Sequence, residues 1–121
     1  MLEQALKQMY DDINIPHLCG WDERYRAALI VLQPADAEAI LPNLDKAFEK
    51  EWDHTALAEA TGDVKQLASH FSGSREGQIL YTKQVESGII LYAAYWPWVG
   101  GSHISVRFGA FRLENCTFTA E

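Results

Sequence analysis

The chain has 121 residues, of which 48% are apolar and 22% are charged, and its net charge is −7. This length suits one domain with a single core, over residues 1–121, and excludes two domains, while the apolar share excludes intrinsic disorder. The acidic balance argues against direct binding of nucleic acid, because a phosphate backbone is bound by clustered Lys and Arg.

The N-terminal residues and the cysteines predict a cytoplasmic protein without a membrane segment. Residues 1–7 contain Glu3 and lack the apolar segment of a secretory signal. The longest apolar run, residues 89–96, is far shorter than the ~18 residues needed to span a bilayer. Cys19 and Cys116 are too few and too far apart for a disulfide scaffold, so we expect two free thiols.

The sequence contains no pattern typical of a metal site, a cofactor site or a catalytic centre. The histidines lack the spacing of metal ligands, and the Gly-Ser segments lack the Lys-Ser or Lys-Thr of a phosphate loop. We interpret Cys19, near His17, as a packed connector thiol, and Asp53, before His54, as a helix cap. We therefore expect no catalytic residue, no metal and no cofactor.

Helical periodicity dominates the first part of the chain. An apolar stripe predicts an amphipathic helix that ends near residue 12. Its members are Leu2, Leu6, Met9 and Ile13. The apolar residues 27–32 then predict a strand, and Pro34, followed by Asp36 and Glu38, predicts the first turn of a helix.

Two further stripes predict core-facing helices. The first consists of Leu41, Leu44, Phe48 and Trp52, with Pro42 as a kink or a new start. Asp53 or Thr55 is placed to cap the next helix. The stripe of that helix consists of Leu57, Thr61, Val64, Leu67, Ala68 and Phe71, with Gly62 as a tolerated residue or a break.

After Gly77 the pattern changes to three strands, over residues 77–85, 88–96 and 102–113. Ser87-Gly88 suits a two-residue hairpin turn, and residues 97–101 suit a longer loop. We predict an α+β fold of two layers, in which N-terminal helices pack on one face of an antiparallel sheet that ends in a three-strand meander.

These two turns predict the register of the meander. Tyr92 would pair with Lys83 on one side and with Val106 on the other, and Gly109 would form a bulge. The core side of the sheet would then carry Ile79, Tyr81, Val85, Ile90, Tyr92, Ala94, Trp96, Ile104, Val106 and Phe108.

The opposite side combines an apolar centre with a polar rim, which is typical of protein interfaces. It would carry Leu80, Thr82, Gln84, Ile89, Leu91, Ala93, Tyr95, His103, Ser105 and Arg107. Because helices in a two-layer fold cover one face of the sheet, we expect something else to cover this one. The cover could be a second copy of the sheet, the first helix folding across it, or a different molecule bound as a partner. The residues predicted to bind that partner are Leu91, Tyr95, Trp98, His103, Arg107, Thr82 and Gln84.

Three functions are compatible with these patterns. The preferred one is a small acidic module that docks on a basic protein and regulates or neutralises it, as an immunity-type inhibitor does. The first alternative is a small-molecule-binding or enzymatic α+β cone whose pocket is lined by Tyr95, His103 and Arg107. The second alternative is a homodimer that pairs its open sheet faces. The charge favours the first, since residues 1–72 contain 13 acidic against 6 basic side chains.

Overall fold

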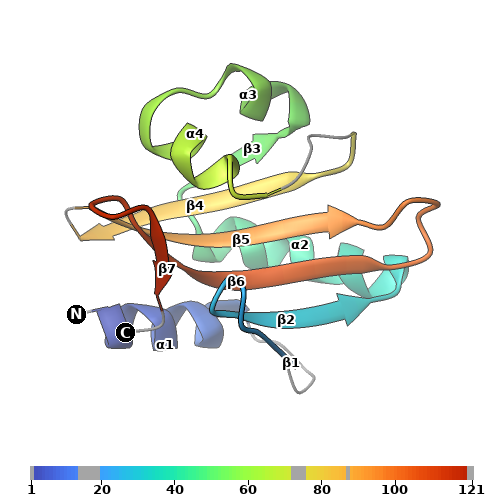
Figure 1. Cartoon of the computed structure of the whole chain (residues 1–121). Coiled ribbons are helices and arrows are strands. Elements are labelled where there is room, and N and C mark those ends of the chain that lie inside the picture. Colours follow the sequence, from blue (N-terminus) through green and yellow to red (C-terminus); the bar gives the residue numbers. More distant parts are fainter. Residues whose placement is uncertain (1, 14–19, 72–75, 87, 120–121) are drawn as a thin grey trace.

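The computed structural model describes residues 2–13, 20–71, 76–86 and 88–119. Over these residues the elements are α1 (Leu2–Ile13), β1 (Gly20–Asp22), β2 (Ala27–Leu32), α2 (Pro34–Ala47), β3 (Lys50–Asp53), α3 (His54–Glu59), α4 (Gly62–Ala68), β4 (Ile79–Glu86), β5 (Ile89–Pro97), β6 (Ile104–Arg112) and β7 (Thr117–Thr119). The strands form one antiparallel sheet in the order β1-β2-β6-β5-β4-β3, with β7 beside β6 (Figure 1). The predicted α+β fold with its β4-β5-β6 meander is confirmed.

Helices α1 and α2 cover one face of the sheet, which we call the α1/α2 face. The predicted stripe of α1 is buried there at all four positions. Helix α2 begins at Pro34 as expected, continues past Pro42, and buries Ala37, Ile40 and Leu44 against the sheet. The fixed φ of proline and its missing N–H cost nothing at a first helical position, which explains where α2 starts.

The opposite face, which we call the second face, is partly covered by α3, α4 and β7 (Figure 1). Asp53 caps α3 as predicted, since its Oδ1 accepts the N–H of Ala56 at 2.8 Å. The chain breaks at Gly62, whose φ of +60° is the left-handed conformation that glycine adopts most easily. Leu67 of α4 is fully buried against this face.

The prediction that a helix continues to Trp52 is wrong. Helix α2 ends at Ala47, Phe48 is already extended, and the N–H of Glu49 donates to the carbonyl of Thr82. Trp52 therefore belongs to the short edge strand β3, opposite Leu80 of β4. Trp52 follows Phe48 by four residues, which is the spacing of a helical stripe, but its pairing with β4 overrides this local pattern.

The predicted register is correct at the first hairpin pair, Glu86 with Ile89, and wrong beyond it. An irregularity between Gln84 and Glu86 shifts β4 by one residue, so that Thr82 rather than Lys83 pairs with Tyr92. Since side chains alternate between faces, this shift places the side chains of β5 on the faces opposite to those predicted, whereas the side chains of β4 keep their predicted faces.

The second hairpin also differs from the prediction. Its loop closes at Trp98, whose N–H donates to the carbonyl of His103 at 2.8 Å. The register from Ile89–Arg112 to Pro97–Ile104 is uninterrupted, so Gly109 forms no bulge. Gly109 instead lies opposite Tyr92, and a Cβ atom at residue 109 would come within 2.9 Å of the Tyr92 hydroxyl oxygen. The glycine is therefore explained by the close approach of this ring.

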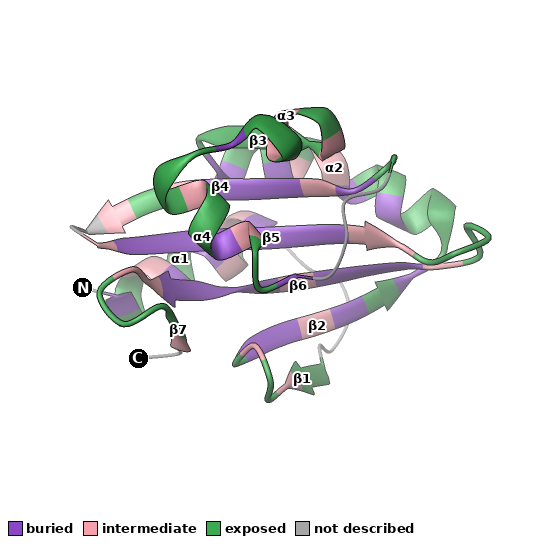
Figure 2. Cartoon of the chain, turned by 45° about the horizontal axis from the view of Figure 1, so that its top comes forward, coloured by how far each residue is buried: buried purple, intermediate pink, exposed green. Residues whose placement is uncertain are grey.

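Strand β5 is consequently buried on both sides, by two separate cores (Figure 2). Its side chains on the α1/α2 face are Ile89, Leu91, Ala93 and Tyr95. Those on the second face are Ile90, Tyr92, Ala94 and Trp96. On the second face, Phe71 of the α4–β4 connection contacts Tyr92 and Trp96, each at a ring-centroid distance of 5.5 Å. The chain thus covers much more of the sheet than one layer of helices would.

Candidate functional site

The corrected register divides the predicted partner-binding residues between the two faces. Leu91 and Tyr95 are only 2% and 8% exposed, under α1 and α2. The expectation that this flank lies open is therefore wrong. Tyr95 pairs with Val106, so Arg107 points to the other face, and the predicted pocket of Tyr95, His103 and Arg107 does not form. The remaining predicted residues lie in two separate regions.

The first region is the part of the second face that α3 and α4 leave uncovered, next to the β5–β6 hairpin. We call it the Trp98 surface, and it consists of Leu29, Val31, Trp96, Trp98, Val99, His103, Ser105 and Arg107. Trp96, Ser105 and Val31 form a row across β5, β6 and β2, because Ser105 pairs with both of the others. Figure 2 shows the hairpin loop and the neighbouring end of β2 as exposed.

Trp98 is exposed and yet held in place. Its indole Nε1 donates to the Ser105 Oγ at 2.7 Å, and its ring lies 4.7 Å from the His103 ring. It is 45% exposed, as is Val31, and Val99 beside it is 86% exposed. A fixed aromatic side chain loses little conformational freedom when a partner packs on it.

Arg107 is held at the β1 side of this surface. Its Nε donates to the Asp22 Oδ2 at 2.8 Å, and its guanidinium carbon lies 5.4 Å from the Tyr25 ring centroid. Both charged side chains are mostly buried, so the ion pair neutralises the cation within the fold. Arg107 therefore contributes shape and hydrogen-bonding capacity rather than net positive charge.

A hollow of about 240 Å³ adjoins the Trp98 surface where the sheet meets α3 and α4. Leu57, Phe71 and Trp96 provide much of its apolar lining, and Lys65 also lines it. Trp96 belongs to both the hollow and the row described above, so the two features are continuous.

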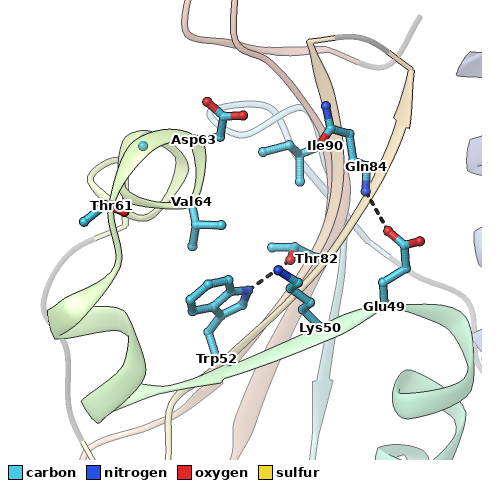
Figure 3. Close-up of a pocket in the computed structure, with 10 residues that line it drawn as sticks. Glu49, Lys50, Trp52, Thr61, Asp63, Val64, Thr82, Gln84 and Ile90 are labelled. Atoms are coloured by element: carbon cyan, nitrogen blue, oxygen red, sulfur yellow. Dashed lines mark hydrogen bonds between the residues drawn. The ribbon is translucent and has the colours of Figure 1, made fainter.

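The second region is a larger pocket of about 420 Å³ between α4 and the β3-β4 edge (Figure 3). We call it the Trp52 pocket. Thr82 and Gln84, the other predicted residues, line it with Trp52, Val64 and Ile90.

Hydrogen bonds fix two of its walls. The Trp52 Nε1 donates to the Thr82 Oγ1 at 3.0 Å, and the N–H of Gln84 donates to the Glu49 Oε1 at 3.3 Å. Lys50 extends along the Trp52 ring, with its Nζ 5.7 Å from the ring centroid. Asp63 also lines the pocket, which thus combines an aromatic wall with two carboxylates.

Sequence reasoning missed Trp52, Val31 and Val99 as site residues. The spacing of Trp52 predicts a place in a helical stripe, and the continuous apolar run of β2 hides which of its side chains point outward. Val99 directly follows Trp98 in a hairpin loop, and this exposed apolar pair is the signal that was available.

The buried tyrosines bear on acid–base chemistry. Burial raises the pKa of Tyr92 well above its usual range, and Arg107 only partly opposes this. Burial, followed by the charge of Glu51, likewise raises the pKa of Tyr81. Both phenols therefore stay protonated at neutral pH.

Metal and thiol chemistry receive no support from the described residues. Within the described part of the chain, no three His, Cys, Asp or Glu side chains are grouped to hold a metal ion. The Cys116 thiol is free and exposed, and Cys19 lies outside the described residues. None of the described helices is long and apolar enough to cross a membrane.

Comparisons with known proteins identify no relative. No protein-family model matches the chain, and searches of curated proteins and of solved structures found no significant match. Function is therefore inferred from the geometry of these two regions.

Proposed function

We propose that the protein is a small acidic protein-binding module that docks on a basic protein through the Trp98 surface and regulates or neutralises it. This proposal rests mainly on Trp98, whose side chain is 45% exposed although it is hydrogen-bonded to Ser105 and packed against His103. Tryptophan is among the residues that most often dominate binding energy at interfaces.

The surroundings of Trp98 support a protein partner. The Trp98 surface offers exposed apolar groups, Val31 and Val99, next to an apolar hollow into which a partner side chain fits. His103 and Arg107 add polar groups at its margin. This arrangement of an aromatic anchor, an apolar centre and a polar rim is the usual anatomy of a binding site.

Charge supports a basic partner rather than a second copy of the chain. The net charge is −7, and Arg107 is neutralised by Asp22. Asp36 and Glu38, both exposed, follow β2 in the first turns of α2. Two copies would repel each other, whereas a basic protein would be steered towards this one. The exposed Cys116 thiol fits the proposed cytoplasmic location.

The test compares two exposed tryptophans. Wild type, Trp98→Ala and Trp21→Ala are immobilised and exposed to an extract of the source cells. Trp21 is a matched control because it is 50% exposed but lies on the edge strand β1 and points to the other face. The retained protein is then purified and its affinity for all three variants is measured directly.

We expect Trp98→Ala to weaken binding by about 2 kcal/mol, roughly thirtyfold, and Trp21→Ala to leave it unchanged. The association rate should fall steeply as salt rises, because exposed charges steer the encounter. Equal binding by both variants, no retained protein, or a salt-independent association rate would each contradict the proposal. A dimer seen by light scattering that Trp98→Ala dissociates would assign the surface to a second copy instead.

A further inference from the structure

We infer that the Trp52 pocket binds an organic cation, namely an alkylammonium or guanidinium group. This site lies at the β3-β4 edge, away from the hairpin that carries Trp98, and does not depend on the function proposed for that surface.

The shape of the pocket suits a small amphipathic group. Its volume is about 420 Å³, and Val64 and Ile90 provide an apolar lining beside the Trp52 ring. The hydrogen bond from Trp52 to Thr82 holds that ring in place before a ligand arrives. The alkyl part of a cation can pack on these groups while its charged end stays near the polar rim.

The electrostatics select a positive charge. Tryptophan presents the most favourable aromatic face for a cation. Glu49 and Asp63 place two carboxylates in the lining against one ammonium, that of Lys50. Glu49 accepts the backbone N–H of Gln84 at 3.3 Å, which holds its carboxylate beside the edge of β4 at the rim of the pocket (Figure 3).

Lys50 shows that the ring already attracts a cation. Its Nζ lies 5.7 Å from the Trp52 ring centroid, within the usual range of a cation–π contact. The lysine is exposed and its stem is flexible, so an incoming cation can displace it. Lys50 therefore acts as a resident competitor, and its removal should strengthen ligand binding.

The test uses N-acetylarginine amide and its neutral isostere N-acetylcitrulline amide. Binding is followed through the Trp52 indole N–H resonance, which the Trp52→Phe variant assigns. We expect saturable shifts with the arginine compound and none with the citrulline compound, at concentrations up to roughly tens of millimolar. Butylguanidinium, a free cation without a peptide backbone, should bind like N-acetylarginine amide. If only N-acetylarginine amide binds, the natural ligand of the pocket is an arginine side chain of a polypeptide.

The test includes one variant that should tighten binding, Lys50→Gln, and one that should weaken it, Glu49→Gln. A variant that merely fails to fold could not tighten binding. Lys50→Gln should tighten binding by about threefold to tenfold, because it removes a like charge and frees the ring. Lys46→Gln, the same change in the last turn of α2, should have no effect. Glu49→Gln should weaken binding by about fivefold.

The inference is overturned if citrulline binds as well as arginine, or if no shift is seen with either compound. It is equally overturned if Lys50→Gln and Lys46→Gln change the affinity alike. None of these results would affect the comparison of Trp98 with Trp21, so the two proposals fail separately.

Discussion

The substitution Gly109→Ala tests the observed pairing of β5 with β6. A methyl group at residue 109 would lie 2.9 Å from the Tyr92 hydroxyl oxygen and 3.2 Å from two of its ring carbons. The Tyr92 ring is fully buried and is packed against Phe71 and Phe118 at centroid distances of 5.5 and 5.6 Å, so it has little room to move.

The expected cost follows from these contacts. Overpacking of a core by one methyl group costs about 1–3 kcal/mol, and replacing glycine by alanine in a strand returns roughly 0.5–1 kcal/mol. We expect a net loss of about 1–2 kcal/mol in the free energy of unfolding. Urea denaturation followed by tryptophan fluorescence measures it, with an unchanged m value as the check on two-state behaviour.

A double-mutant cycle with Tyr92→Leu isolates the contact. The smaller side chain leaves room for the alanine, so Gly109→Ala should be neutral or slightly stabilising in that background. The register predicted from sequence places Val106 opposite Tyr92 and would give no coupling between residues 92 and 109. Equal cost of Gly109→Ala in both backgrounds would refute the observed register.

Three further predictions follow from burial and charge. Leu91→Arg should unfold the protein, because Leu91 is only 2% exposed beneath α1 and α2. Denaturation should show a loss of more than about 4 kcal/mol in the free energy of unfolding. A folded variant would mean that this flank of the sheet is open. Arg107→Ala should lower the free energy of unfolding by about 1–2 kcal/mol, because Asp22 loses its charged partner and keeps only the N–H of Arg24. Asp22→Asn in the same chain should recover part of this loss. Burial raises the pKa values of Tyr81 and Tyr92 in the folded protein above about 10, the value in the unfolded chain. The stability contributed by these two protonated phenols is therefore complete below about pH 10 and is lost as the pH rises above it. Above this pH, the free energy of unfolding should therefore fall by about 1.4 kcal/mol per pH unit for each tyrosine. Tyr92→Phe should remove the part of this slope that one tyrosine contributes.

The helices and the long strands could be predicted because their signals are local. The stripe of α1, Pro34 at the start of α2, and Asp53 as the cap of α3 each act within a few residues. The short strands β1, β3 and β7 carry no such signal, since three or four residues show no usable alternation.

The register could not be predicted, for a physical reason that lies in β5. Every residue from Ile89 to Trp96 is apolar, so either alternation gives an equally apolar core side. The register is set instead by three features: the irregularity after Gln84, the hairpin pair Trp98–His103, and the fit of Tyr92 over Gly109. These are contacts between strands. An error of one residue between β4 and β5, and of three residues between β5 and β6, moved Leu91 and Tyr95 from the core to the predicted surface.

The predicted site residues that survive this error lie in the β5–β6 hairpin loop, in β4 and in β6. Trp98 and His103 flank the hairpin loop, where exposure does not depend on the register. Thr82 and Gln84 remain on the second face, although they line the Trp52 pocket rather than the Trp98 surface.

The most direct measurement of the proposed function is amide hydrogen exchange of the protein alone and in complex with its purified basic partner. We expect new protection in the hairpin around Trp98 and in the end of β2 that carries Val31, with α1 and α2 unchanged. Protection confined to α1 and α2, with none at the hairpin, would contradict it.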